Sequence, residues 1–350
     1  MLVVMRQDAT QQQLRDVVGT IEELGFEARP VPGSERTVVC VIGNDGRVVS
    51  DRLEALSGVL SVVRVTPAYA LVSREQQPET TIVAIAPGVQ VGGAGVVIMA
   101  GPCSVESEEQ IVTTARAVQA AGASCLRGGA FKPRSSPYSF QGLGKRGLEL
   151  LALARRETGL PIVTEAMDEA GAELIAEMGD CIQIGARNMQ NYSLLKAVAR
   201  LGKPVLLKRG MAATINDLLL SAEYILAAGN DQVILCERGV RTFDPAAPTM
   251  FDLGAVPTVH ALSHLPIIAD PSHGTGHRDR VIPMSRAAIA AGADGLLVEV
   301  HPHPEHARSD GPQALNTEQF ARLMGDVRAI ATVIGRTVPR TPGTAEMGNV

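Results

Sequence analysis

The sequence predicts an α/β protein, an eight-stranded TIM barrel preceded by a small α+β domain. From about residue 82, short hydrophobic stretches alternate with helical patterns. Eight such β-then-α units over roughly 250 residues match a TIM barrel in count and in span. Before residue 70 the elements follow the order βαββαβ, which is typical of a ferredoxin-like split βαβ domain.

The amino-terminal domain is predicted from its hydrophobic periodicity. Between residues 11 and 25, apolar side chains recur at Leu14, Val17, Ile21 and Leu24, which is the spacing of one helix face. Short β-branched runs flank this helix and a second, shorter one. The strands are expected at 2–5, 26–31, 37–42 and 59–65, and the helices at 11–25 and 48–58.

The barrel strands are predicted from near-continuous hydrophobic runs. Parallel strands that are covered on both faces have this character. An open, doubly wound sheet would usually carry a glycine-rich first turn, but no GxGxxG or Walker motif follows any of these runs. The strands are expected at 95–101, 124–129, 161–166, 181–186, 204–210, 232–239, 265–272 and 295–301.

The domain boundaries follow from the same patterns. The polar stretch "SREQQPETT" interrupts the hydrophobic pattern and indicates a connecting segment. We therefore expect a ferredoxin-like domain at 1–70, a linker at 71–81, the barrel at 82–340 and a carboxy-terminal tail at 341–350.

The composition excludes several classes of function. The net charge is −5, Trp is absent and aromatic residues make up 3%, so neither a basic nor a stacking surface for nucleic acid is expected. No stretch approaches the roughly 18 apolar residues of a membrane span, and the opening run is too short for a secretion signal. Five scattered cysteines favour a reducing compartment, so we expect a cytoplasmic protein.

Basic side chains follow the ends of many of the expected strands. In a barrel the carboxyl ends of the strands meet on one face, where catalysis takes place. Cations that are gathered so closely repel one another unless anions lie between them, so the substrates should carry several phosphate or carboxylate groups. The alternative is that each cation pairs with an outer helix. The six cations are Arg127, Lys132, Arg134, Arg187, Lys208 and Arg238.

A second group of side chains is expected at the same face. Cys103, His273, Glu299 and Asp310 offer a thiolate, an imidazole and two carboxylates. This mixed donor set suits Mn²⁺, Fe²⁺, Co²⁺ or Zn²⁺ better than Mg²⁺. The three histidines of "VHPHPEH" are interpreted as loop residues, with His301 close to the metal site, because the prolines prevent a helical pair.

Seven stretches together resemble the 3-deoxy-D-arabino-heptulosonate 7-phosphate (DAHP) synthases, in the short-barrel subfamily that they share with 3-deoxy-D-manno-octulosonate 8-phosphate synthase. The resemblance covers nearly the whole barrel, in order. The "KPRSS" tract favours the heptulosonate enzymes, since the octulosonate enzymes typically carry Asn-Arg there and many have Asn in place of Cys103. The stretches are "AGPCSVES", "LRGGAFKPRSSPYSFQGLG", "IQIGARNMQNYSLL", "PVLLKRGMAATINDLLLSAEYI", "ILCERGVRTFD", "DPSHGTGHRD" and "VEVHPHPEHARSDGPQAL".

This resemblance implies a reaction and its binding residues. Phosphoenolpyruvate and erythrose 4-phosphate would condense, with water, to the seven-carbon keto acid phosphate and inorganic phosphate, in the first step of the shikimate pathway. Phosphoenolpyruvate would be bound by Arg127, Lys132, Ala186, Arg187, Lys208 and Arg238. Erythrose 4-phosphate would be bound by Pro133, Arg134, Ser135 and Asp310.

The resemblance also implies the catalytic groups. One divalent metal ion would be held by Cys103, His273, Glu299 and Asp310, and would polarise the sugar aldehyde. The catalytic side chains would be Lys132, Glu165, Lys208 and His273, with Glu165 acting on the water.

The resemblance further implies regulation and assembly. The ferredoxin-like domain would make the enzyme sensitive to an aromatic amino acid, tyrosine or phenylalanine, and the chain would form a homotetramer. Three alternatives stay open: an octulosonate synthase, an aldolase with Lys208 as Schiff-base nucleophile, and a catalytically inactive barrel that senses amino acids.

Overall fold

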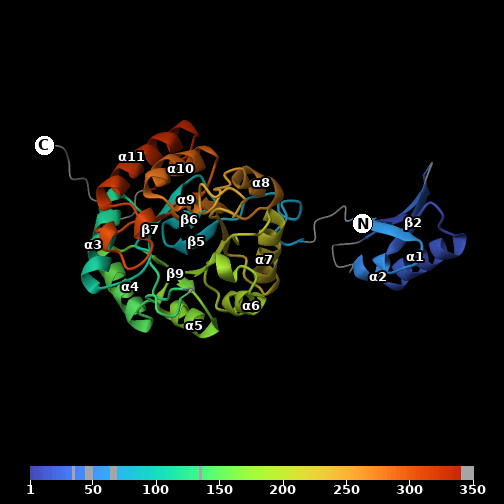
Figure 1. The fold of residues 1–350 in the computed structure, drawn as a ribbon, viewed down its shortest axis with the longest axis horizontal. Helices are drawn as coiled ribbons and strands as arrows, with labels where there is room; N and C mark the ends of the chain where they lie inside the picture. The colour runs from blue at the N-terminus through green and yellow to red at the C-terminus, as the bar shows by residue number, and fades with distance from the viewer. Residues whose placement is uncertain (34–35, 44–49, 64–68, 134–135, 340–350) are drawn as a thin grey trace. The chain divides into compact units, whose positions relative to one another are not determined.

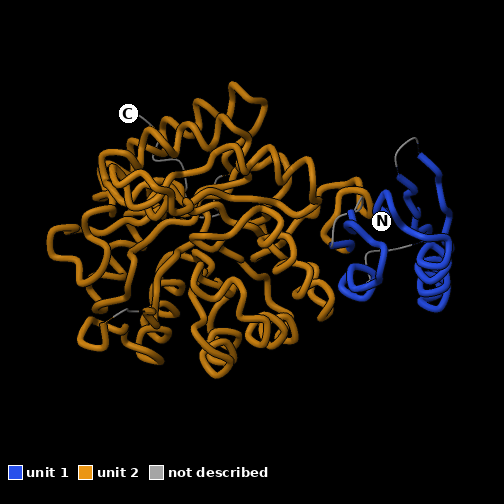
Figure 2. The backbone as a smooth tube through the Cα atoms, turned by 45° about the vertical axis from the view of Figure 1, so that its right-hand side comes forward, with its two compact units in different colours: residues 1–70 blue, residues 71–350 orange. Residues whose placement is uncertain are grey.

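The computed structural model describes residues 1–33, 36–43, 50–63, 69–133 and 136–339. The chain forms two compact units, Met1–Ala70 and Leu71–Val350, which Figure 2 colours separately. Within the described ranges, no helix combines the length and the apolar character that a membrane crossing requires.

The first unit is a four-stranded antiparallel sheet with two helices. Its strand order, β2-β3-β1-β4, places the first strand in the centre, as a split βαβ arrangement requires. Helix α1 begins at Thr10, which forms a reciprocal capping box with Gln13, and it buries Val17 and Ile21 in the core of this unit. The elements are β1 (Leu2–Met5), α1 (Gln11–Glu23), β2 (Glu27–Pro32), β3 (Thr37–Ile42), α2 (Ser50–Glu54) and β4 (Val59–Val63).

The expected βαββαβ order of this unit is confirmed by the structure. The last residues of the strand expected at 59–65 and the first of the helix expected at 48–58 lie outside the described residues.

The second unit contains a closed barrel of eight parallel strands (Figure 1). All eight strands expected from the sequence are present, in chain order around the barrel. Their residues are buried almost throughout, which explains why the sequence runs are hydrophobic without alternation. The strands are β7 (Val97–Gly101), β8 (Cys125–Arg127), β9 (Ile162–Ala166), β10 (Cys181–Ile184), β11 (Val205–Lys208), β12 (Val233–Glu237), β13 (Ile267–Ala269) and β14 (Gly295–Glu299).

Helices surround the barrel in Figure 1. Several begin at a side chain that caps the first turn, as Ser107, Asp168 and Thr214 do for α3, α5 and α7. Helix α3 ends at Gly122, whose positive φ of 97° a larger residue would adopt only with strain. The helices are α3 (Glu108–Ala121), α4 (Lys145–Thr158), α5 (Glu169–Met178), α6 (Tyr192–Arg200), α7 (Ile215–Ala227), α8 (Ala255–Leu262), α9 (Pro271–Thr275), α10 (Arg278–Ala290) and α11 (Thr317–Val333), with 3₁₀ turns η1 (Ala186–Asn188), η2 (Pro304–His306) and η3 (Gly311–Gln313).

A β-hairpin that the sequence analysis did not anticipate precedes the barrel. Strands β5 (Val83–Ala86) and β6 (Val89–Val91) pair with each other. Their apolar side chains join a core cluster with Val97, Cys125 and Cys181, the first residues of three barrel strands. The hairpin therefore packs at the amino end of the barrel and leaves the carboxyl end for the site.

Residues 71–81, expected as a linker, make specific contacts within the second unit. The backbone N–H groups of Leu71 and Val72 each donate to the carboxylate of Glu223, both at 2.9 Å. Buried His264 bonds Thr81 Oγ1 through Nδ1 and the Leu71 carbonyl through Nε2, both at 2.7 Å. The segment is therefore held to the barrel by hydrogen bonds rather than spanning open solvent.

Candidate active site

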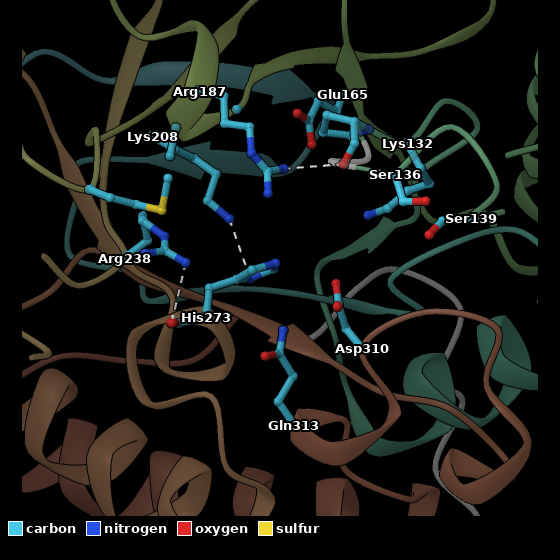
Figure 3. A pocket seen from close by; sticks show the side chains of 14 residues that line it. Lys132, Ser136, Ser139, Glu165, Arg187, Lys208, Arg238, His273, Asp310 and Gln313 are labelled. Atoms are coloured by element: carbon cyan, nitrogen blue, oxygen red, sulfur yellow. Dashed lines mark hydrogen bonds between the residues drawn. The ribbon is translucent and has the colours of Figure 1, made fainter. Parts of the chain in front are cut away.

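A polar cavity of about 480 Å³ lies where the barrel strands end. Figure 3 shows side chains from several strand ends and the loops that follow them turned towards this space. Most of its lining is polar or charged, so it suits a small, highly polar ligand. The lining residues are Lys132, Pro133, Ser136, Ser139, Glu165, Gly185, Ala186, Arg187, Lys208, Met211, Arg238, His273, Asp310 and Gln313.

Four of the six expected cations line this cavity: Lys132, Arg187, Lys208 and Arg238. Burial disfavours the charged form of Lys132, but Cys103, Glu165 and Glu299 nearby raise its pKa above the usual value. Arg187 donates to the carbonyl of Pro133 at 3.2 Å. Arg134, like the neighbouring Ser135, lies outside the described residues.

Arg127, which the sequence analysis grouped with these cations, is not among the residues that line the cavity. Arg127 is buried beneath the cavity, and its Nη1 contacts Glu299 Oε1 at 3.2 Å and donates to the Pro102 carbonyl at 2.8 Å. Burial alone would lower its pKa, but Glu299 raises it, so the guanidinium stays charged. Arg127 is therefore held against Glu299.

Lys208 and His273 are joined by the buried carboxylate of Asp270, the residue that follows β13. Asp270 accepts from Lys208 Nζ, and its Oδ2 lies 2.8 Å from His273 Nδ1. Burial would raise the pKa of Asp270, but His273 and Lys208 hold it well below the usual value. The charged Asp270 fixes the imidazole through Nδ1, which leaves Nε2 directed towards Glu299 at 3.5 Å.

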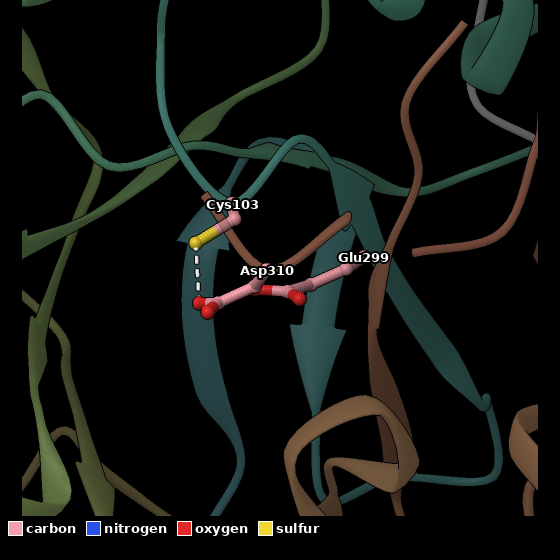
Figure 4. A group of neighbouring side chains, drawn as sticks. All are labelled: Cys103, Glu299 and Asp310. Carbon is pink, nitrogen blue, oxygen red and sulfur yellow. Dashed lines mark hydrogen bonds between the residues drawn. The ribbon is translucent and has the colours of Figure 1, made fainter. Parts of the chain in front are cut away.

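Cys103, Glu299 and Asp310 form a compact group of possible metal ligands. One ligand atom from each lies within 4.8 Å of the other two. Figure 4 shows them converging from the ends of two strands and the loop after β14, with the Cys103 thiol donating to Asp310 at 2.8 Å. His273 borders this group through its contact with Glu299. The structure thus groups three of the four side chains that the sequence analysis singled out, and places His273 beside one of them, Glu299.

The electrostatics of this group fit a divalent cation. Burial, followed by the charge of Glu299, raises the pKa of the Cys103 thiol to about 12. Two carboxylates beside a buried thiol are stabilised when a cation takes the place of the proton. A thiolate, an imidazole and two carboxylates are donors that Mn²⁺, Fe²⁺, Co²⁺ and Zn²⁺ accept.

Two further expected residues, Glu165 and Ala186, also line the cavity. Glu165 accepts from Gln183 Nε2 at 3.0 Å, and Ala186 begins the 3₁₀ turn after β10. The sequence reasoning missed Gln313, Ser136 and Ser139, which also line the cavity. Their loops carry no periodic pattern, so their position inside the stretches that resemble the family is the one signal that could have indicated them.

The histidines of "VHPHPEH" lie beside the site. His301 is buried, and its Nδ1 accepts from the backbone N–H of His303 at 3.0 Å. Because Nδ1 accepts this bond, the neutral imidazole carries its proton on Nε2, and a protonated nitrogen cannot bind a metal. Nε2 lies 3.5 Å from Glu106 Oε2. His303 and His306 are exposed in the loop.

Comparison with known proteins agrees with this geometry. The model of the DAHP synthetase I family matches residues 73–332, and that of the DAHP synthase ferredoxin-like domain matches residues 1–67. Phospho-2-dehydro-3-deoxyheptonate aldolase of Thermotoga maritima is 50% identical over 335 residues, which cover 96% of this chain and 99% of that protein. A crystal structure of the Thermotoga maritima enzyme, described as a DAHP synthase, has a TM-score of 0.92 at 49% identity, with 96% and 98% of the two chains covered.

More distant relatives are described as octonate aldolases rather than heptonate aldolases. The 2-dehydro-3-deoxyphosphooctonate aldolase of Nitratidesulfovibrio vulgaris is 34% identical over 251 residues, 67% of this chain and 91% of that protein. That match leaves a third of this chain uncovered, whereas the heptonate enzyme matches both units. The chain therefore belongs to the DAHP synthetase I family and carries a DAHP synthase ferredoxin-like domain at its amino end.

Proposed function

We propose that this chain catalyses the metal-dependent condensation of phosphoenolpyruvate, erythrose 4-phosphate and water to DAHP and inorganic phosphate. The observation that carries the proposal is one cavity that combines four cations with the group formed by Cys103, Glu299 and Asp310. The cations suit two phosphates and a carboxylate, and the thiol–carboxylate group suits a metal ion beside them.

The phosphoenolpyruvate end of the cavity is assigned to its cationic wall. Arg187, Lys208 and Arg238 would bind the phosphate and the carboxylate, with Lys132 between them and the metal group. Ala186 would contribute backbone at the start of η1. Arg127 would act indirectly, by holding Glu299 in place. Guanidinium groups bind such oxyanions in a bidentate manner, which fixes the enol phosphate for attack.

The sugar phosphate is assigned to the loop after β8. We infer that Pro133, Arg134 and Ser135 take its phosphate, and that Asp310 lies near its aldehyde end. Ser136 and Ser139, which line the same side of the cavity, support this placement because their hydroxyl groups can donate to phosphate oxygens.

We infer that Cys103, His273, Glu299 and Asp310 hold the metal, which would supply Lewis-acid polarisation of the aldehyde. The fixed positions of the two substrates would bring C3 of the enol phosphate to the aldehyde carbon, where the new C–C bond forms. Water then adds at C2, and C–O cleavage of the resulting hemiketal phosphate releases phosphate.

The proton transfers are assigned to four side chains that face the cavity. Glu165 would take a proton from the attacking water. Lys132 lies near enough to Glu165 for the charge of this carboxylate to help raise the pKa of the lysine. Lys208 and His273 share Asp270, so this pair can hold or move a proton at the other end of the cavity.

The amino-terminal unit is assigned a regulatory role. We infer inhibition by tyrosine or phenylalanine and assembly as a homotetramer, both supported by the match to a DAHP synthase ferredoxin-like domain. All five cysteines are free thiols, in keeping with a cytoplasmic location.

The test follows the loss of phosphoenolpyruvate absorbance with Mn²⁺ present. Rapid loss is expected with erythrose 4-phosphate and little with arabinose 5-phosphate, the substrate expected of an octulosonate synthase. Loss without any aldose, or none with erythrose 4-phosphate, would remove the assignment. A barrel that only senses amino acids would show no loss under any of these conditions.

A further inference from the structure

Glu299 is the most enclosed member of the possible metal group. Its side chain is 1% exposed, so solvent cannot satisfy its oxygens. Oε1 faces two positive or potentially positive groups, Arg127 at 3.2 Å and His273 at 3.5 Å. The orientation of the carboxylate therefore depends on what holds the other oxygen.

Gln313 holds that other oxygen. Its Nε2 donates to Glu299 Oε2 at 2.7 Å, and it is the one donor to this oxygen among the residues that the structure describes. The two oxygens thus have different partners, and the amide holds the carboxylate so that one oxygen stays directed towards Arg127 and His273. An amide can do this without adding charge to a group that already contains two carboxylates.

The backbone around Gln313 is itself fixed. Arg278, at the start of α10, donates to the carbonyls of Ala314 at 2.6 Å and Gly311 at 2.8 Å, on either side of Gln313. Just before this turn, Asp310 has a positive φ of 52°, which few residues other than glycine adopt. The same short segment therefore presents one ligand, Asp310, and the amide that orients another.

We propose that Gln313 is a positioning residue of the metal site, which sets the orientation of Glu299 before the ion binds. Groups that orient a ligand in this way typically change metal affinity by about 10- to 100-fold when they are removed. Figure 3 shows Gln313 beside Asp310 and His273 at the cavity, where its amide can reach the group. The inference rests on the proposed function only in treating these side chains as metal ligands.

The test measures binding of Mn²⁺ alone to chelator-treated full-length protein, by calorimetry. Gln313→Met keeps the length of the side chain and removes the donor, so Mn²⁺ should bind about 10- to 100-fold more weakly. Gln313→Ala is measured as a second variant, so that the test can still be made if one of the two variants fails to fold. Gln319→Ala is the matched control, because Gln319 lies nearby in the first turn of α11, where its side chain accepts from the backbone N–H of Asn316.

The outcomes separate this inference from the proposed function. Weakened Mn²⁺ binding by the Gln313 variants, with unchanged binding by Gln319→Ala, supports the positioning role. Equal Mn²⁺ affinity in wild type and Gln313→Met overturns it, even if the wild-type protein forms DAHP. Conversely, a wild type that binds Mn²⁺ but consumes no phosphoenolpyruvate rejects the proposed reaction and leaves the role of Gln313 intact.

Discussion

The carboxylate of Glu165 lies directly against the backbone of Gly185, and Glu165 Oε1 occupies the space that a Cβ at residue 185 would fill. Gly185 has an ordinary φ of −68°, so its backbone conformation does not require glycine. What requires glycine is the space for this carboxylate. Gln183 lies opposite Glu165 in the pairing of β9 with β10, and its amide donates to the carboxylate.

This relationship predicts that Gly185→Ala lowers activity by displacing Glu165. A displacement of about 1 Å at a reacting group can cost about 100-fold in rate, so kcat should fall by that order. The measurement is steady-state kinetics with both substrates saturating. Gly325→Ala, at a helical glycine where a Cβ meets no atom within 4 Å, is the control and should keep full activity. Unchanged kcat in Gly185→Ala would show that Glu165 is not in the reaction.

Removal of the proposed thiolate ligand should abolish metal-dependent turnover. Cys103→Ala leaves a small buried side chain, so the fold should persist while the ion loses one of four donors. Metal content after gel filtration and kcat with Mn²⁺ measure the two effects. Cys40→Ala, in the amino-terminal unit, provides the comparison. Full activity in Cys103→Ala would mean that the ligand set is wrong.

A chelator and borohydride distinguish metal catalysis from Schiff-base catalysis. Lys208 Nζ is held by an ion pair with buried Asp270, whereas a Schiff base needs an amine that is free to attack a carbonyl carbon. A chelator should therefore remove activity, and Mn²⁺ should restore it. Borohydride with erythrose 4-phosphate, the substrate that carries an aldehyde, should trap no adduct at Lys208 by mass spectrometry. A trapped adduct at Lys208, with activity indifferent to the chelator, would favour the aldolase.

The barrel unit should keep its activity without the first unit. Each unit has its own core, and a truncated Thermotoga maritima DAHP synthase of known structure covers 77% of this chain at 48% identity. A chain of residues 71–350 retains the contacts of Leu71 and Val72 with Glu223. It should show similar kcat and no response to tyrosine or phenylalanine. Retained inhibition would place the effector site in the barrel.

The buried thiols predict a pH dependence of labelling and of stability. Burial raises the pKa of Cys181 to about 12 and that of Cys125 well above its usual value. Only thiolates react quickly, so iodoacetamide at pH 8 should label Cys40 first and these two only after unfolding in urea. Mass spectrometry of digested protein measures this order. Equal labelling rates in the folded protein would contradict the burial of these thiols.

The sign for stability follows from the same shift. In the unfolded chain the thiol ionises near its ordinary pKa of 9.0, whereas folded Cys181 stays protonated up to about 12. The contribution of this thiol to the free energy of unfolding is therefore complete below pH 9 and is lost as the pH rises towards 12. The free energy of unfolding should decrease by about 1.4 kcal/mol per pH unit for such a thiol between these values. Urea titrations at pH 8 and pH 10, which measure the free energy of unfolding, test this decrease.

The sequence by itself determined the two folds and their order. Hydrophobic runs without alternation predict parallel strands that are buried on both faces, and the structure has all eight at the expected places. The same reasoning placed Cys103, Glu299 and Asp310 at one face, because the strands of a barrel end together. The β5–β6 hairpin was not predicted, although its residues lie within the range expected for the barrel domain.

Only the tertiary structure decided which group each charged side chain contacts. Strand-end position does not distinguish Lys208, which lines the cavity, from Arg127, which is buried against Glu299. Nor could spacing reveal that Gln313 donates to Glu299, fourteen positions earlier in the chain, or that Gly185 makes room for Glu165. The periodicity of a sequence indicates which residues are buried. Which side chains pair with one another depends on directions and distances that are set only when the chain has folded.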